Sequence, residues 1–468
     1  MKNNSHSSRR KFLQQLGATS LATASAPFIT LGAQEKAEAR ILHYERKISA
    51  NDTIRIGVIG YGVQGHFDLA TALKVPGVEL AGICDLYPGR LVNAKEQFGP
   101  DLYTTRNYKD LLDRPDIDAV LICSVDVWHA QMTLDALAKG KHVYIEKPMI
   151  YAISEGHPVM EAAKKSGKIV QVGSQRVSSI GYQKAKELLA AGEIGELNMV
   201  NAVYDRQSSI GAWQYTIPKD ASPETTDWET FIEVTDKMPF DAKKFFWWRA
   251  FKEVGTGVAG DLFIHLLSGT HLITGSKGPE SIYSTGQLSY WNDGRNLPDV
   301  MSGVMQYPES PEHPAYLMTL QVNFISGTGG QEIIQLVGSE GVMTLKGNGL
   351  TVTHSIMPEA PGFGGYDSLF TFSKSMQDEM RADYEAKWTA EQRKRPTKED
   401  IVFRAPDGYS DHLDHFTNFF DAIRTNGKVV EDAEFGFRAA APALACNQSY
   451  FDQKIIQWDP VNLKLKKS

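Results

Sequence analysis

A short apolar run that leads directly into a glycine-rich turn constrains this sequence more than any other feature. Residues 53–60, TIRIGVIG, have the length and composition of a buried strand, and residues 65–75, GHFDLATALKV, follow a helical pattern of apolar positions. The same alternation continues through 78–85, VELAGICD, and 118–125, DAVLICSV, as far as 168–173, KIVQVG. This repeat predicts an α/β fold with a parallel sheet that is covered by helices on both faces.

Three glycines mark the turn between the first strand and the first helix. Gly60 permits a tight turn, Gly62 leaves room for a pyrophosphate against the backbone, and Gly65 lets the helix pack closely on the strand. The helix N-terminus adds free N–H groups and partial positive charge for the phosphates. Asp85 ends the second strand, where a carboxylate accepts from ribose hydroxyls and repels a 2′-phosphate. We therefore expect NAD(H) rather than NADP(H), unless Arg90, one turn further on, reaches a 2′-phosphate instead.

Two more stretches fall at the ends of later strands, on the same edge of the predicted sheet. Residues 123–130, CSVDVWHA, follow one strand, and Glu146-Lys147-Pro148 follow the next. With the glycine turn, Asp85 and the closing segment at 412–444, this E-K-P triplet resembles the Gfo/Idh/MocA oxidoreductases, which include glucose–fructose oxidoreductase and inositol dehydrogenase. The motifs are specific for fold and cofactor but not for substrate. The candidate cofactor-binding residues are Gly60, Gly62, Val63, Gln64, Gly65, Asp85, Ser124, His129, Glu146, Lys147 and Gln175.

The resemblance implies a Rossmann dinucleotide-binding domain and a second α/β domain built on a large, mostly antiparallel sheet. We place the first domain at residues 53–175 and the second, for substrate binding and oligomerisation, at residues 176–468. The second half agrees, because runs such as GELNMVNAVYD, DVMSGVMQYP and LTVTHSIM read as successive strands between polar or Gly-rich turns. Residues 207–246 are irregular, and residues 373–388 predict an inserted, highly charged surface helix.

Hydride transfer from an alcohol needs an acceptor for the hydroxyl proton and groups that hold the carbinol in place. In family dehydrogenases the lysine of E-K-P binds substrate and takes part in catalysis, a role that the resemblance gives to Lys147. Asp261 and His265 are four residues apart, which places them about 40° apart on one helix face. The resemblance implies that His265 is the general acid/base and that Asp261 helps hold substrate hydroxyls. His271 falls off that face and is interpreted as structural.

Other polar side chains are candidates for holding a polyol, and Trp248 is a candidate for stacking on a sugar face, although paired tryptophans are equally common as plain core residues. The candidate substrate-binding residues are Arg176, Tyr182, Trp248 and Arg249, with Tyr204 and Arg206 as further possibilities. The Asp261 and His265 pair also has the spacing of half a metal site. No third ligand follows at a suitable distance in the sequence, so no metal is expected.

The N-terminus predicts export. Residues 8–17, SRRKFLQQLG, precede a weakly apolar stretch rich in Ala, Ser and Thr, which is typical of a twin-arginine signal. We place the signal at residues 1–33 and a linker at 34–52, with cleavage after Ala26 or Ala33. This route carries folded, cofactor-loaded proteins, so the expected location is the periplasm and the export machinery is an expected partner. The alternative is an uncleaved anchor at a membrane surface.

Composition limits the other partners. The net charge of −7 gives no reason to expect nucleic acid, and the three cysteines have neither metal-site nor disulfide spacing. The sequence predicts an NAD-dependent oxidoreductase that acts on a secondary hydroxyl of a sugar, glycoside or cyclitol and recycles a tightly bound cofactor. The alternatives are an NAD-dependent enzyme that cleaves glycosides by oxidation and elimination, and a sugar-binding protein without turnover. By analogy with the family, we expect a homo-oligomer, either a dimer or a tetramer.

Overall fold

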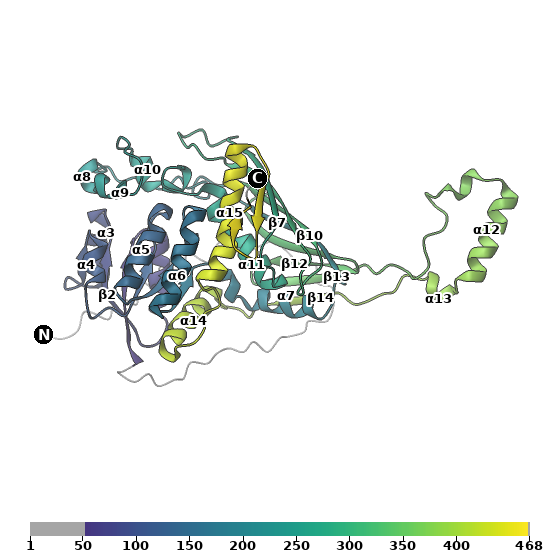
Figure 1. Cartoon of the computed structure of the whole chain (residues 1–468), viewed down its shortest axis with the longest axis horizontal. Coiled ribbons are helices and arrows are strands. Elements are labelled where there is room, and N and C mark those ends of the chain that lie inside the picture. Colours follow the sequence, from purple (N-terminus) through teal and green to yellow (C-terminus); the bar gives the residue numbers. More distant parts are fainter. Residues whose placement is uncertain (1–51, 467–468) are drawn as a thin grey trace.

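The computed structural model describes residues 52–466. The twin-arginine pair and both candidate cleavage sites lie outside the described residues. Two sheets lie next to each other, the first formed by the N-terminal part of the chain and the second by the C-terminal part (Figure 1). The expected α/β fold is confirmed, with a parallel sheet followed by a large, mostly antiparallel one.

Six parallel strands form the first sheet, in the order β3-β2-β1-β4-β5-β6. The strand order reverses between β1 and β4, which creates the crevice where Rossmann folds bind their ligands. The strands are β1 (Ile54–Ile59), β2 (Val78–Cys84), β3 (Tyr103–Thr105), β4 (Ala119–Ile122), β5 (His142–Ile145) and β6 (Val170–Val172). The helices between them are α2 (Val63–Ala72), α3 (Pro88–Phe98), α4 (Tyr108–Leu112), α5 (Asp126–Ala138) and α6 (Gly156–Ser166).

Ten strands form the second sheet, in the order β14-β13-β12-β11-β7-β10-β9-β8-β15-β16. Strands β7 and β10 pair in parallel, and the other neighbours pair antiparallel. The strands are β7 (Leu197–Asp205), β8 (Ser281–Gln287), β9 (Val300–Tyr307), β10 (Tyr316–Asn323), β11 (Gln331–Gly338), β12 (Gly341–Lys346), β13 (Gly349–His354), β14 (Ile401–Arg404), β15 (Ile456–Asp459) and β16 (Lys464–Leu465).

Helices cover one face of the second sheet. Burial alternates along β9, where Met301 and Met305 are buried and Ser302, Val304 and Gln306 are exposed. The buried face packs against α7 (Ile180–Ala190), α11 (Ile264–Thr274) and α15 (Ala433–Asp452). The other face is open in the single chain.

The closing helices tie the two sheets together. Helix α14 (Asp411–Thr425) packs against α2, and its Phe416 ring stacks on Tyr144 of β5 with centroids 4.4 Å apart. Helix α15 contacts both β6 and β8. The apolar core is therefore shared between the two sheets, which fixes the position of the second domain relative to the cleft in the first.

Two segments depart from this plan. We call residues 207–250 the covering segment; it contains the short helices α8 (Pro223–Thr226), α9 (Trp228–Phe231) and α10 (Ala242–Phe246) and lies across the ends of α3, α4 and α5 (Figure 1). We call residues 355–400 the arm; it contains α12 (Lys374–Lys387) and α13 (Ala390–Arg393) and projects away from the body (Figure 1). No helix in residues 52–466 has the length and apolar character needed to cross a membrane.

Candidate active site

A cavity of about 480 Å³ lies at the carboxyl ends of the first sheet's strands. Its walls include the glycine turn at Gly60 and Gly62, with Asp85 at the end of β2. The opposite wall comes from the covering segment and includes Phe246 and Trp248. The cavity is thus enclosed between the two domains at the place where the sequence predicts the cofactor.

The glycine turn has the shape that a pyrophosphate requires. Gly60 has φ +89°, and a Cβ there would lie 2.5 Å from the backbone oxygen of Cys123. A Cβ on Gly65 would lie 2.1 Å from the backbone oxygen of Gly60, so helix and strand can approach this closely only with glycine. A Cβ on Gly62 would meet only Arg90, at an ordinary 3.7 Å. Nothing in the chain therefore requires glycine at position 62, which leaves the space beside it for a ligand.

Asp85 has more partners than the sequence suggests. Its carboxylate accepts the backbone N–H groups of Tyr61 at 2.8 Å and Tyr87 at 2.9 Å, and it pairs with the Arg90 guanidinium at 3.2 Å. The Arg90 guanidinium also lies over the Phe246 ring, 5.6 Å from its centroid. An incoming ribose would share this carboxylate with Arg90, so the two side chains together decide how a 2′-hydroxyl or 2′-phosphate is received.

Three charged side chains converge where β5 ends. The Lys147 ammonium donates to Asp261 Oδ1 at 2.6 Å and to the Asp261 backbone oxygen at 2.8 Å. Arg249 donates through Nε to the same Oδ1 at 3.0 Å and also lines the cavity. Burial alone would raise the pKa of Asp261, but the charges of Lys147 and Arg249 outweigh it and hold that pKa well below its ordinary value. Asp261 therefore remains a carboxylate that orients two cations.

The expected regular helix around Asp261 is instead a π-helical turn over Ala259–Phe263, followed by α11. Within this wider turn the Asp261 carbonyl accepts from Lys147, a partner outside the helix. The 40° separation calculated for a regular helix thus does not apply. Asp261 still bonds Lys147, and His265 lies close enough to be affected by the charges of both.

His265 is an uncharged, unpaired base at this point. Burial, together with the nearby charge of Lys147, lowers the pKa of His265 well below its ordinary value. Its Nδ1 is buried and has no hydrogen-bond partner among residues 52–466. The Tyr204 ring lies 5.9 Å from the imidazole, centroid to centroid. A neutral imidazole can accept a proton, and because Nδ1 is closed to solvent, Nε2 is the nitrogen that a bound hydroxyl would have to reach.

A pair of buried acids, of which the sequence analysis identified only one, lies below the glycine turn. Glu146 accepts from Gln175 at 2.7 Å and from Gln64 at 3.4 Å, and Gln64 also donates to Asp68 at 2.9 Å. Burial raises the pKa of both Asp68 and Glu146. Gln175 therefore positions Glu146 instead of lining the cavity. The signal for Asp68 was an acidic residue within a helix that must pack on the sheet.

Two other predicted residues serve the framework. Both ring nitrogens of His129 lie against backbone oxygens, 2.7 Å from Pro148 and 3.2 Å from Ser124, so His129 joins two loops at the strand ends. Ser124 itself lines the cavity, as do Val63 and Gln64. Tyr182 is buried, and a Cβ on Gly269 would lie only 2.4 Å from its ring. His271 is buried with Nε2 2.9 Å from the Tyr307 hydroxyl, in agreement with a structural role.

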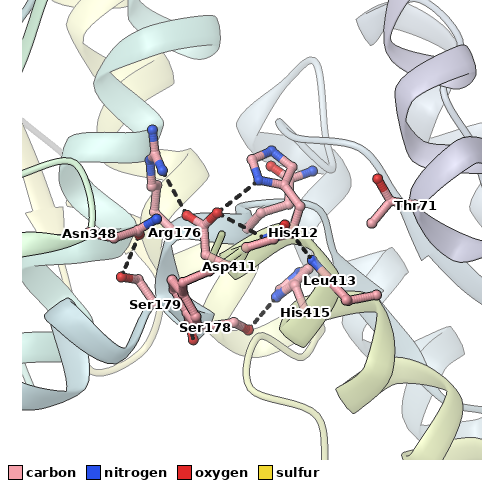
Figure 2. A network of polar contacts seen from close by, with 12 residues as sticks. Thr71, Arg176, Ser178, Ser179, Asn348, Asp411, His412, Leu413 and His415 are labelled. Atoms are coloured by element: carbon pink, nitrogen blue, oxygen red, sulfur yellow. Dashed lines mark hydrogen bonds and ion pairs between the residues drawn. The ribbon is translucent and has the colours of Figure 1, made fainter. Parts of the chain in front are cut away.

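Arg176 lies in a polar network at the junction of the domains (Figure 2). Its guanidinium pairs with Glu332 of β11 at 3.1 Å and with Asp411, the first residue of α14, at 2.7 Å. Asp411 also accepts from His412, and burial of its carboxyl is outweighed by the charges of His412 and Arg176, so that its pKa is lowered. Arg176 is thus already paired with two carboxylates, and its availability to a substrate depends on opening this network.

The covering segment is fastened to the first domain by long-range hydrogen bonds. The Tyr87 hydroxyl donates to Asp220 at 2.6 Å, and the Trp128 indole donates to the Phe231 backbone oxygen at 2.9 Å. Arg106 donates to the backbone oxygens of residues 224 and 225. The sequence analysis missed this role, because the only local signal was an irregular stretch rich in aromatic residues.

The glycine turn, the strand-end acids and the converging Lys147, Asp261 and His265 define a two-domain Rossmann protein of the nicotinamide-dinucleotide-binding class. The chain belongs to the Gfo/Idh/MocA oxidoreductase family: residues 54–174 match its NAD-binding Rossmann fold and residues 231–458 match its C-terminal alpha/beta domain. Among residues 52–466, no group of three or more His, Cys, Asp or Glu side chains is arranged to hold a metal ion.

Similar proteins include an inositol 2-dehydrogenase from Salmonella typhimurium, 31% identical over 188 residues, which are 40% of this chain and 54% of the relative. A glycosyl hydrolase family 109 protein from Shewanella baltica is 28% identical over 240 residues, 48% of this chain and 50% of the relative. The chain thus spans about half the length of the curated relatives it matches. The structure of a scyllo-inositol dehydrogenase from Lactobacillus casei, with NAD(H) and scyllo-inositol bound, has a TM-score of 0.57 at 18% identity and covers 86% of this chain and 99% of that one.

Proposed function

We propose that this protein is an NAD-dependent oxidoreductase acting on a secondary hydroxyl of a sugar, glycoside or cyclitol. The observation that carries the proposal is the convergence of Lys147, Asp261 and the neutral His265 beside Arg249, which bonds Asp261 and lines the dinucleotide cavity. The inositol 2-dehydrogenase relative and the scyllo-inositol complex support a polyol as the substrate class.

The residues present fit a nicotinamide dinucleotide, which would supply the hydride acceptor. In the proposed mechanism, His265 takes the hydroxyl proton through Nε2, because its Nδ1 is closed to solvent. Lys147 and Arg249 donate to the substrate oxygen as it gains negative charge, because their cationic groups are held in place by Asp261. Asp261 therefore positions both donors.

We propose further that the cofactor stays bound between turnovers and that the overall reaction is redox-neutral. The covering segment supports this, since its hydrogen bonds to Tyr87, Arg106 and Trp128 close one side of the cavity. NAD(H) is the proposed form because Asp85 lies at the ribose end. The Arg90 guanidinium beside it is the feature that would instead favour NADP(H).

Glycoside cleavage is the second candidate function. The family 109 glycosyl hydrolase relative favours it. In that reaction, transient oxidation at one carbon would acidify its neighbour, loss of that proton would expel the glycosidic oxygen with the aglycone, water would add to the double bond that forms, and return of the hydride to the carbonyl carbon would restore the sugar. Cleavage of this kind would use the same base, His265, and would equally suit a cofactor that never leaves.

The decisive experiment begins with mass spectrometry of the cofactor released from purified, denatured protein. Intact protein is then mixed with single sugars, glycosides and cyclitols while absorbance at 340 nm is followed. We expect bound NAD(H) and, with the polyol that is the substrate, a measurable absorbance change of no more than one equivalent per chain. Release of the aglycone from a chromogenic glycoside would identify the cleavage reaction instead.

Other outcomes would contradict the proposal. Steady production of free NADH from added NAD would show an exchangeable cofactor. Bound NADP(H) would show that Arg90 outweighs Asp85. A protein that binds a polyol without any change at 340 nm, and without aglycone release, would be a binding protein of this fold.

We also propose a homo-oligomer. The open face of the second sheet carries exposed apolar side chains on three neighbouring strands, Tyr283, Val304 and Leu317. Apolar sheet faces of this kind are typical of contacts between subunits. Export by the twin-arginine route, with the periplasm as the final location, remains a proposal that rests on the sequence of residues 8–17.

A further inference from the structure

The arm is an ordered projection of the second sheet. It leaves after β13 and returns as β14, and these two strands pair directly with each other. Inside the arm, the Phe363 and Tyr384 rings stack with centroids 4.5 Å apart, the Tyr384 hydroxyl donates to the Pro361 backbone oxygen, and Ser373 caps α12. The chain thus builds a defined shape here, well away from the rest of the molecule (Figure 1).

Helix α12 lacks the packing that a helix of its length normally needs. None of its 14 residues is buried. An isolated helix shorter than about 15 residues is marginal in water, and most helices in proteins are stabilised by packing one face. Something outside the single chain therefore has to cover a face of α12 if the arm is to be stable.

The arm also concentrates exposed apolar side chains. Six of the large apolar residues that are strongly exposed lie between positions 357 and 380, namely Met357, Tyr366, Phe370, Phe372, Met376 and Met380. Met376 and Met380 are four residues apart and therefore share one face of α12. We call the surface formed by Met376 and Met380 the methionine face.

Charge favours a second copy of this chain as the partner. Helix α12 carries the exposed acids Asp378, Glu379, Asp383 and Glu385 together with the exposed cations Lys374, Arg381 and Lys387, and Lys374 pairs with Asp378. A helix with nearly balanced charge of both signs can meet a second copy of itself without net repulsion. The same balance gives it little attraction to an anionic membrane surface.

From these observations we infer that the arm is an intersubunit clasp, in which the methionine face of α12 packs on a second copy of the chain. The inference rests on the proposed homo-oligomer. It goes beyond it by assigning part of the interface to the arm rather than to the open sheet face alone.

The test compares two double variants by size-exclusion chromatography with light scattering over a dilution series. Met376→Glu with Met380→Glu places two charges on the methionine face. Ser375→Glu with Ala382→Glu adds the same charge about half a turn away on the same helix. We expect the methionine variant to weaken self-association at least tenfold, while the control variant associates like the wild type. Bound nicotinamide per chain, measured by mass spectrometry, should be unchanged in both.

A third variant addresses the rest of the interface. Val304→Glu charges the open sheet face and leaves the arm intact. If the methionine variant keeps the wild-type mass at every dilution while Val304→Glu dissociates, the clasp is wrong. The open sheet face then forms the contact between subunits. Equal weakening by the methionine variant and its control would also overturn the clasp. A wild type that is monomeric throughout would refute the oligomer itself.

Discussion

At the scale of single residues, the candidate site depends on one carboxylate serving two cations. Asp261 accepts from Lys147 through both its side chain and its backbone, and it holds Arg249 through the same Oδ1. The charge that remains after this pairing is positive, which suits an oxygen that becomes anionic in the transition state. His265, whose pKa is lowered by burial and by Lys147, is the proposed proton acceptor, and the two cations are the proposed stabilisers of the oxygen's charge.

Replacing either Lys147 or His265 should abolish turnover without loss of the bound cofactor. For Lys147→Met and for His265→Ala we expect the single-turnover rate at 340 nm to fall by roughly 10²–10⁴-fold, the usual contribution of acid–base help. Bound cofactor and thermal stability should stay close to wild type. Lys244→Met, which removes a cation paired with Glu253 outside the cavity, is the matched control and should keep the wild-type rate. A near-native His265→Ala would move the proton acceptor elsewhere, with Tyr204 next to test.

The state of His265 also predicts a pH profile. A base works only in its unprotonated form, and the pKa of His265 is lowered by burial and by Lys147. Its active form therefore persists as the pH falls through 6.5, the ordinary value for histidine. We expect the single-turnover rate to be flat from neutral pH to well below 6.5. An acid limb centred near pH 6.5 would mean that the imidazole is solvated, or that another group is the base.

At the scale of elements, the covering segment most affects how the site is used. Its helices α9 and α10 carry no proposed catalytic group, yet they line the cavity opposite the glycine turn. Phe246 contributes directly, since its ring lies under the Arg90 guanidinium and packs edge-on against Tyr87 at 5.5 Å. The position of this ring links the covering segment to Tyr87 and Arg90, which both donate to the Asp85 carboxylate.

Removing the Phe246 ring should loosen the cofactor while leaving the chemistry in place. For Phe246→Ala we expect the rate of nicotinamide release to rise at least tenfold, which corresponds to about 1.4 kcal/mol. The measurement is loss of bound nicotinamide fluorescence after dilution into buffer that contains a scavenging dehydrogenase. Phe451→Ala removes an exposed ring from α15 and should release cofactor like the wild type. Equal release rates in both variants and the wild type would show that the segment does not retain the cofactor.

Sequence patterns predict those helices and strands whose own residues show the apolar pattern of a helix or a strand. Strands β1, β2 and β4 are short apolar runs, and the glycine turn is dictated by backbone geometry, so these could be located in advance. Strands β14 and β16 could not, because edge strands of two to four residues are defined by the neighbour they pair with. Within the π-helical turn, the Asp261 carbonyl accepts from Lys147, more than a hundred residues earlier, which no local pattern contains.

The candidate site residues also fall into two groups, those that a sequence motif predicts and those that only the folded chain brings together. The residues at strand ends and in motifs, such as Lys147 and Asp261, were found because a motif carries them. The partners of Arg176 were not, because Glu332 and Asp411 are far from it in sequence and meet it only in the folded chain. The covering segment was missed for a related reason, since its aromatic residues have no period and its contacts with the first domain are made by residues about a hundred positions or more away in the sequence.

At the scale of the whole molecule, the two sheets share one apolar core, and the cleft lies between them. Helices α14 and α15 come last in the chain, yet they pack against α2 and β6 of the first domain. The first domain is therefore fully packed only when the C-terminal helices have folded back onto it. A protein that is loaded with its cofactor before export has to finish this step in the cytoplasm.

Export by the proposed twin-arginine route predicts the cell fraction in which a variant of the signal should be found. With Arg9→Lys and Arg10→Lys together, positive charge is kept but the twin-arginine pair is lost, so we expect the protein to remain in the cytoplasmic fraction with its nicotinamide bound. The wild type should appear in the periplasmic fraction, also with nicotinamide bound. Fractionation followed by mass spectrometry of released cofactor measures both. Periplasmic wild-type protein without cofactor that becomes active with added NAD would contradict the reason proposed for folded export.

The hydrogen bonds that fasten the covering segment have a kinetic consequence. If the covering segment retains the cofactor as proposed, a dinucleotide leaves when the bonds of Tyr87, Arg106 and Trp128 to this segment break, and its departure is then a partial unfolding event with its own free energy. Amide hydrogens in α8 and α9 should then exchange with solvent at the same opening rate at which cofactor escapes. Both rates should rise in parallel at low denaturant concentration, far below the global transition. The cofactor in the cleft would thus be the molecule that was bound when the chain folded, because it would not exchange with free cofactor afterwards.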